Sequence, residues 1–232
     1  MKALLLSCIC VLMLAACAKN VPADPEIAPW LPQAQAGDPD AMFNIASIYD
    51  RRTQATSCLS DQHLKHFSQY QEWCLKAARA GHPQASNDAL NLITYLPDKK
   101  ELRRQFQNNA LKGGIPDAEY SMGKAYLEGD GVPKNEDEGF RLIKKAADKG
   151  HGNAMNYYGR LFFTGSLVFP DPERAVAIWQ KGADQGSVGC MYSLSAAYML
   201  GKGCQKDLAK ARYWKDKGLA IVQEHNYKIF HP

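Results

Sequence analysis

The sequence predicts an all-α solenoid of about five stacked helix hairpins, and three observations carry this prediction. Segments that begin at Ala118, Ala154 and Cys190 align with one another in a frame of 36 residues. Within the frame, small and apolar residues recur at the spacing of one helical face, on either side of a glycine-rich break. A Gly-x-x-x-Ala junction marks further units upstream, at Gly37–Ala41 and Gly81–Ala85. One hairpin of this size cannot bury its apolar face, so neighbouring units are expected to stack.

Composition and charge exclude several other classes of protein. The 232-residue chain is 46% hydrophobic and 22% charged, which excludes collagen, a coiled-coil rod and a disordered acidic tail. Its net charge of +4 is spread along the chain without a basic stripe, so no nucleic-acid partner is expected.

The first residues are typical of an export signal. Lys2 precedes an uncharged apolar stretch at residues 3–16. At about 1.5 Å per residue this stretch is roughly 21 Å long, shorter than the ~30 Å hydrocarbon core of a bilayer. Residues 1–16 are therefore expected to be a signal peptide and not a permanent membrane span.

The end of this stretch, Leu14-Ala15-Ala16-Cys17, resembles the lipobox of bacterial lipoproteins. The resemblance implies that the mature chain begins at Cys17 and that this cysteine carries the lipid. Since Ala18 and not Asp follows, it also implies the periplasmic face of the outer membrane of a Gram-negative cell. Residues 17–36 contain four prolines and are expected to form a semi-rigid tether.

The unit from Ala118 shows how each hairpin should form. Small and apolar residues from Ala118 to Tyr126 lie on one helical face. Gly129-Asp130-Gly131 then breaks the helix, because glycine tolerates positive φ. Asn135 begins the second helix, and Gly150 ends it.

The two upstream units depart from this pattern. The unit from Ala41 contains an insertion at residues 52–66, and the unit from Ala85 is shortened, with Pro97 where its helices should reverse. The solenoid is expected to span residues 37–220. The apolar residues 221–232 are expected to cap the open core of the last repeat.

The repeated pattern resembles the Sel1-like repeat, a relative of the tetratricopeptide repeat. The units from Ala118, Ala154 and Cys190 match it well, and the first unit matches through Trp73 and Lys76-Ala77-Ala78. The resemblance implies a right-handed α/α superhelix whose first helices line a concave face. It also implies binding of another protein in that groove, without a cofactor and without catalysis.

Candidate partner-binding residues follow from the same resemblance, because first-helix positions beside the small-residue column face the groove in the tetratricopeptide relatives. Aromatic and arginine side chains on such a face are typical of binding sites. Alternatively, the two tyrosines of this set pack against the next repeat. The predicted set is Phe43, Tyr120, Lys124, Asn156, Arg160, Phe163, Tyr192 and Met199.

Four cysteines remain beyond Cys17, and an oxidising compartment would permit disulfides. Cys58 in the insertion and Cys74 on the second helix are expected to form a bridge. Cys190 and Cys204 are too far apart along one helix to pair, so both are expected to be unpaired and packed. The alternative for the first pair is a zinc site with His63 and His66, but the spacing matches no known zinc motif.

Enzyme motifs are scarce. Ser121-x-x-Lys124 fits the S-x-x-K of penicillin-recognising enzymes, but the companion motifs are absent and the repeat frame already accounts for both positions. The sequence therefore favours a non-enzymatic, lipid-anchored periplasmic protein. For a lipidated protein of this kind, the resemblance to the Sel1-like repeat family implies one role, immunity, which is the inhibition of a secreted effector. The alternatives are an envelope scaffold for cell-wall or secretion machinery and, least favoured, an enzyme acting on β-lactams or peptidoglycan.

Overall fold

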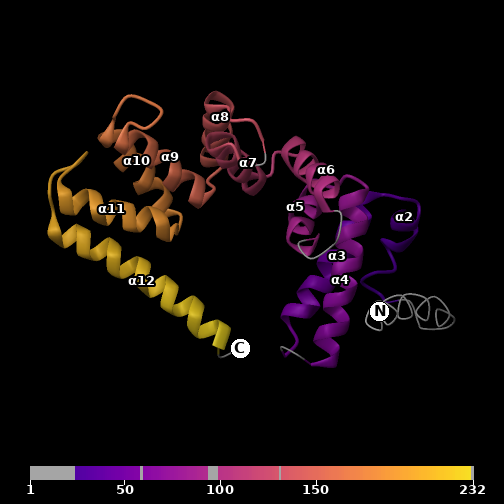
Figure 1. The fold of residues 1–232 in the computed structure, drawn as a ribbon. Helices are drawn as coiled ribbons and strands as arrows, with labels where there is room; N and C mark the ends of the chain where they lie inside the picture. The colour runs from indigo at the N-terminus through magenta and orange to yellow at the C-terminus, as the bar shows by residue number, and fades with distance from the viewer. Residues whose placement is uncertain (1–23, 58–59, 94–98, 131, 231–232) are drawn as a thin grey trace, which may run out of the picture.

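The computed structural model describes residues 24–57, 60–93, 99–130 and 132–230, and its regular structure within these ranges is entirely helical. From α3 onward, consecutive helices pair into five hairpins that form an arch, with α3 and α4 at one end and α11 and α12 at the other (Figure 1). The predicted all-α stack of about five hairpins is confirmed. The helices are α2 (Leu31–Gln35), α3 (Pro39–Gln54), α4 (Asp61–Arg79), α5 (Pro83–Leu92), α6 (Lys99–Lys112), α7 (Pro116–Glu128), α8 (Glu136–Asp148), α9 (Gly152–Thr164), α10 (Pro172–Asp184), α11 (Val188–Leu200) and α12 (Leu208–Phe230).

Glycine ends the first helix of each of the last three hairpins. Gly129, Gly165 and Gly201 adopt left-handed backbone conformations with φ of 75°, 75° and 69°. A residue with a Cβ would be strained there, which explains the predicted glycine break. The second helix then begins at a side-chain cap, since the Asn135 and Asp171 side chains accept backbone N–H hydrogen bonds from the first turns of α8 and α10.

A column of small residues lets the two helices of a hairpin approach closely. A Cβ added at Gly123 would lie 2.9 Å from Ile143 Cγ1, and one at Gly159 would lie 2.3 Å from Trp179 Nε1. Ser195 occupies the same position in the last hairpin, and its hydroxyl donates to the Ala211 carbonyl at 2.7 Å. The close approach at these three positions fixes the depth at which each second helix packs.

The buried apolar side chains divide into a C-terminal and an N-terminal part. One large cluster joins α8 to α12 around Tyr158, Phe162 and Trp179. Two smaller clusters, both contacted by Met42 and Trp73, hold α2 to α6 together. The chain passes from one part to the other at the turn between α6 and α7 (Figure 1).

Residues 24–36 do not belong to the predicted tether but fold onto α3. The Arg52 guanidinium lies 2.5 Å from Asp24 and 2.6 Å from Glu26, and Ile27 and Ala34 are buried against α3. Prolines do not prevent this folding, because Pro32 stands in the first turn of α2, where a backbone N–H has no intrahelical acceptor. The remainder of the predicted tether, residues 17–23, lies outside the described residues, as do the signal segment and the lipidation site at Cys17.

The insertion and the C-terminal segment both extend helices. The insertion at residues 52–66 lengthens the first hairpin, so α3 and α4 have 16 and 19 residues where each helix from α7 to α11 has 13. The predicted cap at residues 221–232 is, as far as it is described, the continuation of α12, which has 23 residues. Pro97 lies outside the described residues.

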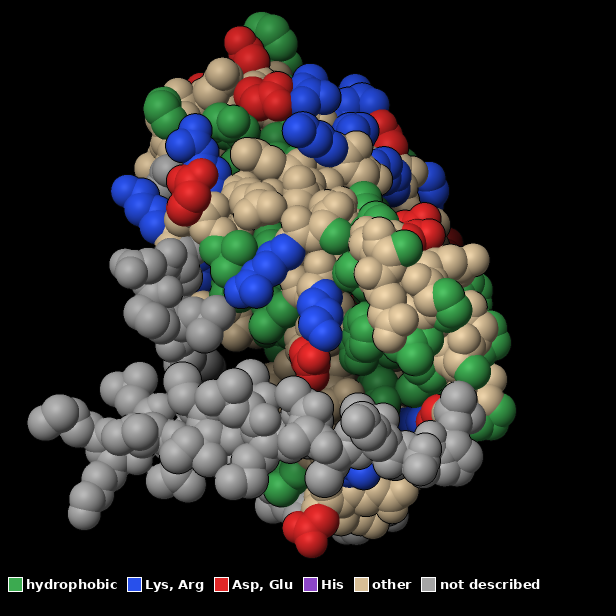
Figure 2. All heavy atoms as spheres, turned by 90° about the vertical axis from the view of Figure 1, so that its right-hand side faces the viewer, with side chains coloured by type: hydrophobic (Ala, Val, Ile, Leu, Met, Phe, Trp, Pro, Cys, Tyr) green, Lys and Arg blue, Asp and Glu red, His purple; other side chains and the backbone are tan. Residues whose placement is uncertain are grey.

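Charge on the surface is mixed in sign. On the face that Figure 2 presents, Lys and Arg side chains lie beside Asp and Glu side chains over the N-terminal hairpins. Within the described part of the chain, no helix combines the length and the apolar character that crossing a membrane requires.

Candidate protein-binding groove

A pocket lies between the first helices of the third and fourth hairpins. It has a volume of about 240 Å³ and is lined by α7, α9 and the loop that follows α9. The lining residues are Leu127, Glu128, Tyr157, Arg160, Leu161, Thr164, Ser166 and Leu167. The helices position this pocket because their small-residue columns face the second helices, which leaves the opposite side of α7 and α9 uncovered.

The pocket combines apolar walls with one unpaired cation. Leu127, Leu161 and Leu167 provide the apolar surface, and the Arg160 guanidinium lies 5.8 Å from the centroid of the Tyr157 ring. Glu128 is 3.8 Å from Lys124, whereas no carboxylate among the described residues forms an ion pair with the exposed Arg160. The pocket is therefore suited to an apolar side chain whose neighbour carries a negative charge.

Three of the predicted groove residues instead contact the next first helix. Phe43 stacks on His82 with the ring centroids 4.1 Å apart, and the Tyr120 ring lies 5.1 Å from that of His151 in a tilted arrangement. Asn156 accepts a hydrogen bond from the Ser193 hydroxyl at 2.6 Å. The alternative reading of Tyr120 is thus correct, because consecutive first helices in this stack touch along this row.

Phe163 and Lys124 are also occupied by contacts within the protein. The centroid of the Phe163 ring is 5.1 Å from that of Trp179. The ammonium group of Lys202 lies 4.4 Å from the centroid of the same Phe163 ring. Lys124 forms the ion pair with Glu128 described above. Tyr192 and Met199, in the last hairpin, are 39% and 52% exposed. Of the predicted set, Arg160, Tyr192 and Met199 are the most accessible.

The predicted Cys58–Cys74 bridge is not confirmed. Cys74 is a free, buried thiol whose Sγ donates to the Ala85 carbonyl at 3.6 Å, while Cys58 lies outside the described residues. Since α4 begins at Asp61, a rise of about 1.5 Å per residue carries Cys74 roughly 20 Å along the helix, where it faces α5. Burial raises the pKa of the Cys74 thiol to about 12. Cys190 and Cys204 are free as predicted; Cys190 is buried and Cys204 partly so.

The histidines and the S-x-x-K serine show no catalytic arrangement. His63 Nδ1 lies 3.1 Å from the Thr53 carbonyl, and the His66 ring lies 6.1 Å from that of Tyr49, so both pack on α3. The described ranges contain no group of three residues able to hold a metal ion. Ser121 is exposed on α7, and among the described contacts none joins it to Lys124.

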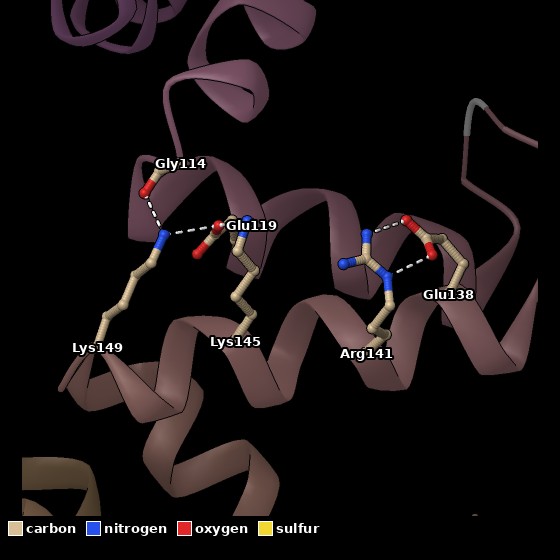
Figure 3. A network of polar contacts seen from close by, with 6 residues as sticks. All are labelled: Gly114, Glu119, Glu138, Arg141, Lys145 and Lys149. Atoms are coloured by element: carbon tan, nitrogen blue, oxygen red, sulfur yellow. Dashed lines mark hydrogen bonds and ion pairs between the residues drawn. The ribbon is translucent and has the colours of Figure 1, made fainter.

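A buried charge network in the third hairpin is the feature that sequence reasoning missed. Glu119 of α7 has no exposed surface, and its Oε1 lies 2.8 Å from the ammonium groups of both Lys145 and Lys149 of α8 (Figure 3). Lys149 also donates to the Gly114 carbonyl at 2.5 Å, so it ties the turn before α7 to α8. The signal was present in the 36-residue frame, because Met155 and Met191 stand where Glu119 does.

The same figure shows a second, exposed pair. Arg141 donates to both carboxylate oxygens of Glu138, at 2.7 and 2.8 Å, on the same side of α8 as Lys145 and Lys149. Arg141 lowers the pKa of Glu138 chiefly through these hydrogen bonds. Because this pair is solvated, it contributes little to stability.

Comparisons with known proteins agree with this architecture. Residues 71–82, 116–151, 152–187 and 188–214 match the Sel1 repeat family. Two curated proteins of Schizosaccharomyces pombe are similar: chitin synthase regulatory factor 1, 32% identical over 95 residues, and chitin synthase regulatory factor 3, 25% identical over 118 residues. The aligned parts cover 40% and 50% of this chain but only 21% and 13% of those proteins.

Solved structures are similar over most of the chain. A Sel1 repeat protein from Oxalobacter formigenes superposes with a TM-score of 0.65 at 28% identity, covering 80% of this chain and 74% of that one. A protective antigen with an SLR fold, from uropathogenic Escherichia coli, gives 0.58 at 22% identity, covering 87% and 49%. An immunity protein from Pseudomonas aeruginosa gives 0.52 at 20% identity, covering 89% and 78%. With its matched repeats and its stacked hairpins, this chain is a Sel1-like repeat protein.

Proposed function

We propose that this protein binds another protein along its first helices, and that the pocket between α7 and α9 receives part of that partner. The observation that carries the proposal is the combination of apolar walls with the unpaired Arg160 guanidinium. A partner segment with an apolar side chain next to a carboxylate would fill the pocket and pair with Arg160. The Sel1 repeats of this chain support the same function, because repeats of this kind mediate binding between proteins.

We further propose that the protein is anchored through Cys17 to the periplasmic face of the outer membrane and acts there as an immunity protein. The lipobox-like sequence supports the location. The fold shared with an immunity protein from Pseudomonas aeruginosa is consistent with the role. In this role the groove would hold a secreted effector in an inactive complex.

The test is capture from envelope extracts followed by quantitative binding. The chain without its signal segment, residues 18–232, is immobilised, captured proteins are identified by mass spectrometry, and the affinity of each is measured by calorimetry. Arg160→Glu is expected to weaken the complex by about tenfold or more, since it replaces an attraction by a repulsion at the pocket. Lys181→Glu is the matched control, with the same charge change on the exposed side of α10.

Two results would contradict the proposal. Equal affinity of the Arg160→Glu and Lys181→Glu proteins for the captured partner would remove the pocket from the binding site. Co-expression tests the immunity role separately: the protein should protect cells from a periplasm-acting effector encoded beside it, and Arg160→Glu should reduce that protection. Absence of any protection is the second result, and it would contradict the immunity role.

A further inference from the structure

The last described hairpin leaves uncovered a face that the two preceding junctions cover. Tyr120 of α7 and Asn156 of α9 occupy the same position in successive repeats. The Tyr120 ring contacts His151 at the start of α9, and the Asn156 side chain accepts a hydrogen bond from Ser193 of α11. The residue at the same position of α11, Tyr192, is 39% exposed, and its ring lies against Gly218 of α12 in its own hairpin.

The second helix of the last hairpin, α12, is likewise exposed at positions that are buried in α8 and α10. Ile143 of α8 and Trp179 of α10 are buried, but Lys215 replaces them in α12 and is exposed. Ala147 and Ala183 are buried in the same two helices, whereas Leu219 in their place is 39% exposed.

Two other positions contact a following hairpin elsewhere: Phe140 lies 5.5 Å from Tyr158 of α9, and Phe163 lies 4.4 Å from the Lys202 ammonium group. Arg212 and Met199 stand in their places and are exposed, and Lys215 and Leu219 follow Arg212 on the same side of α12, three and seven residues later. We call Tyr192, Met199, Arg212, Lys215 and Leu219 the end surface.

The charge around the end surface is positive. Residues 202–224 contain six lysines and arginines against three carboxylates. One of these carboxylates, Asp207, already caps α12 and lies 3.9 Å from Lys210. Arg212 and Lys215 form no ion pair among the described residues, so they can pair with an incoming carboxylate.

We propose that the end surface binds an acidic amphipathic helix of a partner protein, placed where the first helix of another hairpin would lie. Each earlier junction is a helix packed on a hairpin, so a helix is the shape that this face accepts. Tyr192, Met199 and Leu219 take the apolar stripe of that helix, and its Asp or Glu residues pair with Arg212 and Lys215. A second copy fits poorly, because a symmetric contact would set these two cations against their own equivalents.

This surface is distinct from the pocket of the proposed function, and its test uses a defined probe. The probe is a fluorescein-labelled peptide of 20 residues, with leucines at helical spacing and glutamates on the flanking positions; its control carries lysines in place of the glutamates. Anisotropy titrations of the protein are expected to show about tenfold tighter binding of the glutamate peptide at 0.1 M salt, and a smaller preference at 0.5 M.

Variants locate the binding site. Lys215→Glu and Leu219→Glu are expected to remove the preference for the glutamate peptide, while Lys181→Glu, a residue of the preceding second helix, keeps it. Both end-surface positions are exposed, and melting curves establish that the variants remain folded. Because the pocket beside Arg160 would also accept a leucine next to a glutamate, the titrations are repeated in the Arg160→Glu protein, where the preference for the glutamate peptide should persist; this separates the proposal from the pocket.

Four outcomes overturn the proposal: no saturable binding of the glutamate peptide, equal binding of both peptides, loss of binding in Arg160→Glu but not in Lys215→Glu, or a dimer in sedimentation that Leu219→Glu dissociates. The last of these would assign the end surface to a second copy of this chain.

Discussion

Glu119 of α7 and Lys149 of α8 form an ion pair of 2.8 Å in which the carboxylate has no exposed surface at all. Lys145 lies at the same distance from the same oxygen, whereas the other carboxylate oxygen has no hydrogen-bond partner. A buried carboxylate with only one oxygen satisfied depends strongly on its two cations. The two lysines are partly exposed, so water can solvate them if the carboxylate is removed.

Replacing the two lysines and replacing Glu119 should therefore lower the free energy of unfolding by unequal amounts. The double variant Lys145→Ala, Lys149→Ala leaves a buried unpaired charge and is expected to lower the free energy of unfolding by about 3 kcal/mol. Glu119→Met places there the residue that the two following repeats use and should change it by about 1 kcal/mol or less. Urea unfolding measures both, with the exposed Lys144→Ala as the control. Equal losses for the two variants would show that the carboxylate is not the sensitive partner.

The stability of the first two hairpins should depend on the protonation of His82. Its neutral Nδ1 accepts the Ala85 N–H at 3.1 Å and caps α5, and burial lowers its pKa despite Asp40 and Asp88 nearby. Because the folded-state pKa is below the unfolded value, the unfolded chain takes up more protons as the pH falls below about 6.5, and stability decreases. His82→Asn keeps a capping oxygen that does not titrate. Its urea midpoint should fall less between pH 7.5 and pH 5 than that of the unmodified protein; an unchanged pH dependence would contradict the assignment.

Alanine at Gly159 should destabilise the protein, although alanine is normally the better helix former. The new Cβ would lie 2.3 Å from the indole nitrogen of Trp179, a buried side chain that donates to the Asn156 carbonyl. Overpacking of this kind costs about 1–3 kcal/mol. Gly189→Ala is the control, because its Cβ would come closest to the amide nitrogen of Asn156, at 2.9 Å, and the end of a polar side chain yields more easily than a buried indole. Thermal melting compares the two, and similar melting temperatures would show that α9 and α10 can separate without cost.

The free thiols should differ in reactivity. Burial raises the pKa of Cys74 to about 12 and raises that of Cys190, and both side chains are inaccessible. Cys204 is partly exposed and should be alkylated first by iodoacetamide in the native protein, as read by peptide mass spectrometry. Denaturation without reductant should then expose Cys74 to the reagent. If Cys74 resists alkylation even in denaturant, it is in a disulfide after all.

The repeat frame was sufficient to predict the hairpins, because the residues that define it act within one hairpin. Gly129 needs only its own left-handed backbone, and Gly159 needs only the Trp179 of its partner helix. Contacts between hairpins could not be predicted in the same way. Whether Tyr120 faces solvent or His151 depends on the stagger of successive repeats, which the spacing of residues within a repeat does not determine.

Two further differences between the sequence-based expectations and the structure also arise from tertiary contacts. Four prolines favoured an extended tether, but Arg52 and the apolar surface of α3 hold residues 24–36 in place. Glu119 was visible as an acidic residue in an apolar column, yet only the folded hairpin brings Lys145 and Lys149 to it. In the candidate site, Arg160 was predicted from its position alone, whereas the pocket beside it required the placement of Leu167 in the loop after α9.

The division of the buried side chains into two parts has a mechanical consequence. Tension applied to the ends of the arch passes through both parts in series, and through the α6–α7 turn that connects them. Each part can unfold while the other remains folded, so a molecule under tension would lengthen in separate steps. A bound protein that contacts both sides of this turn would connect the two parts, and they would then unfold together.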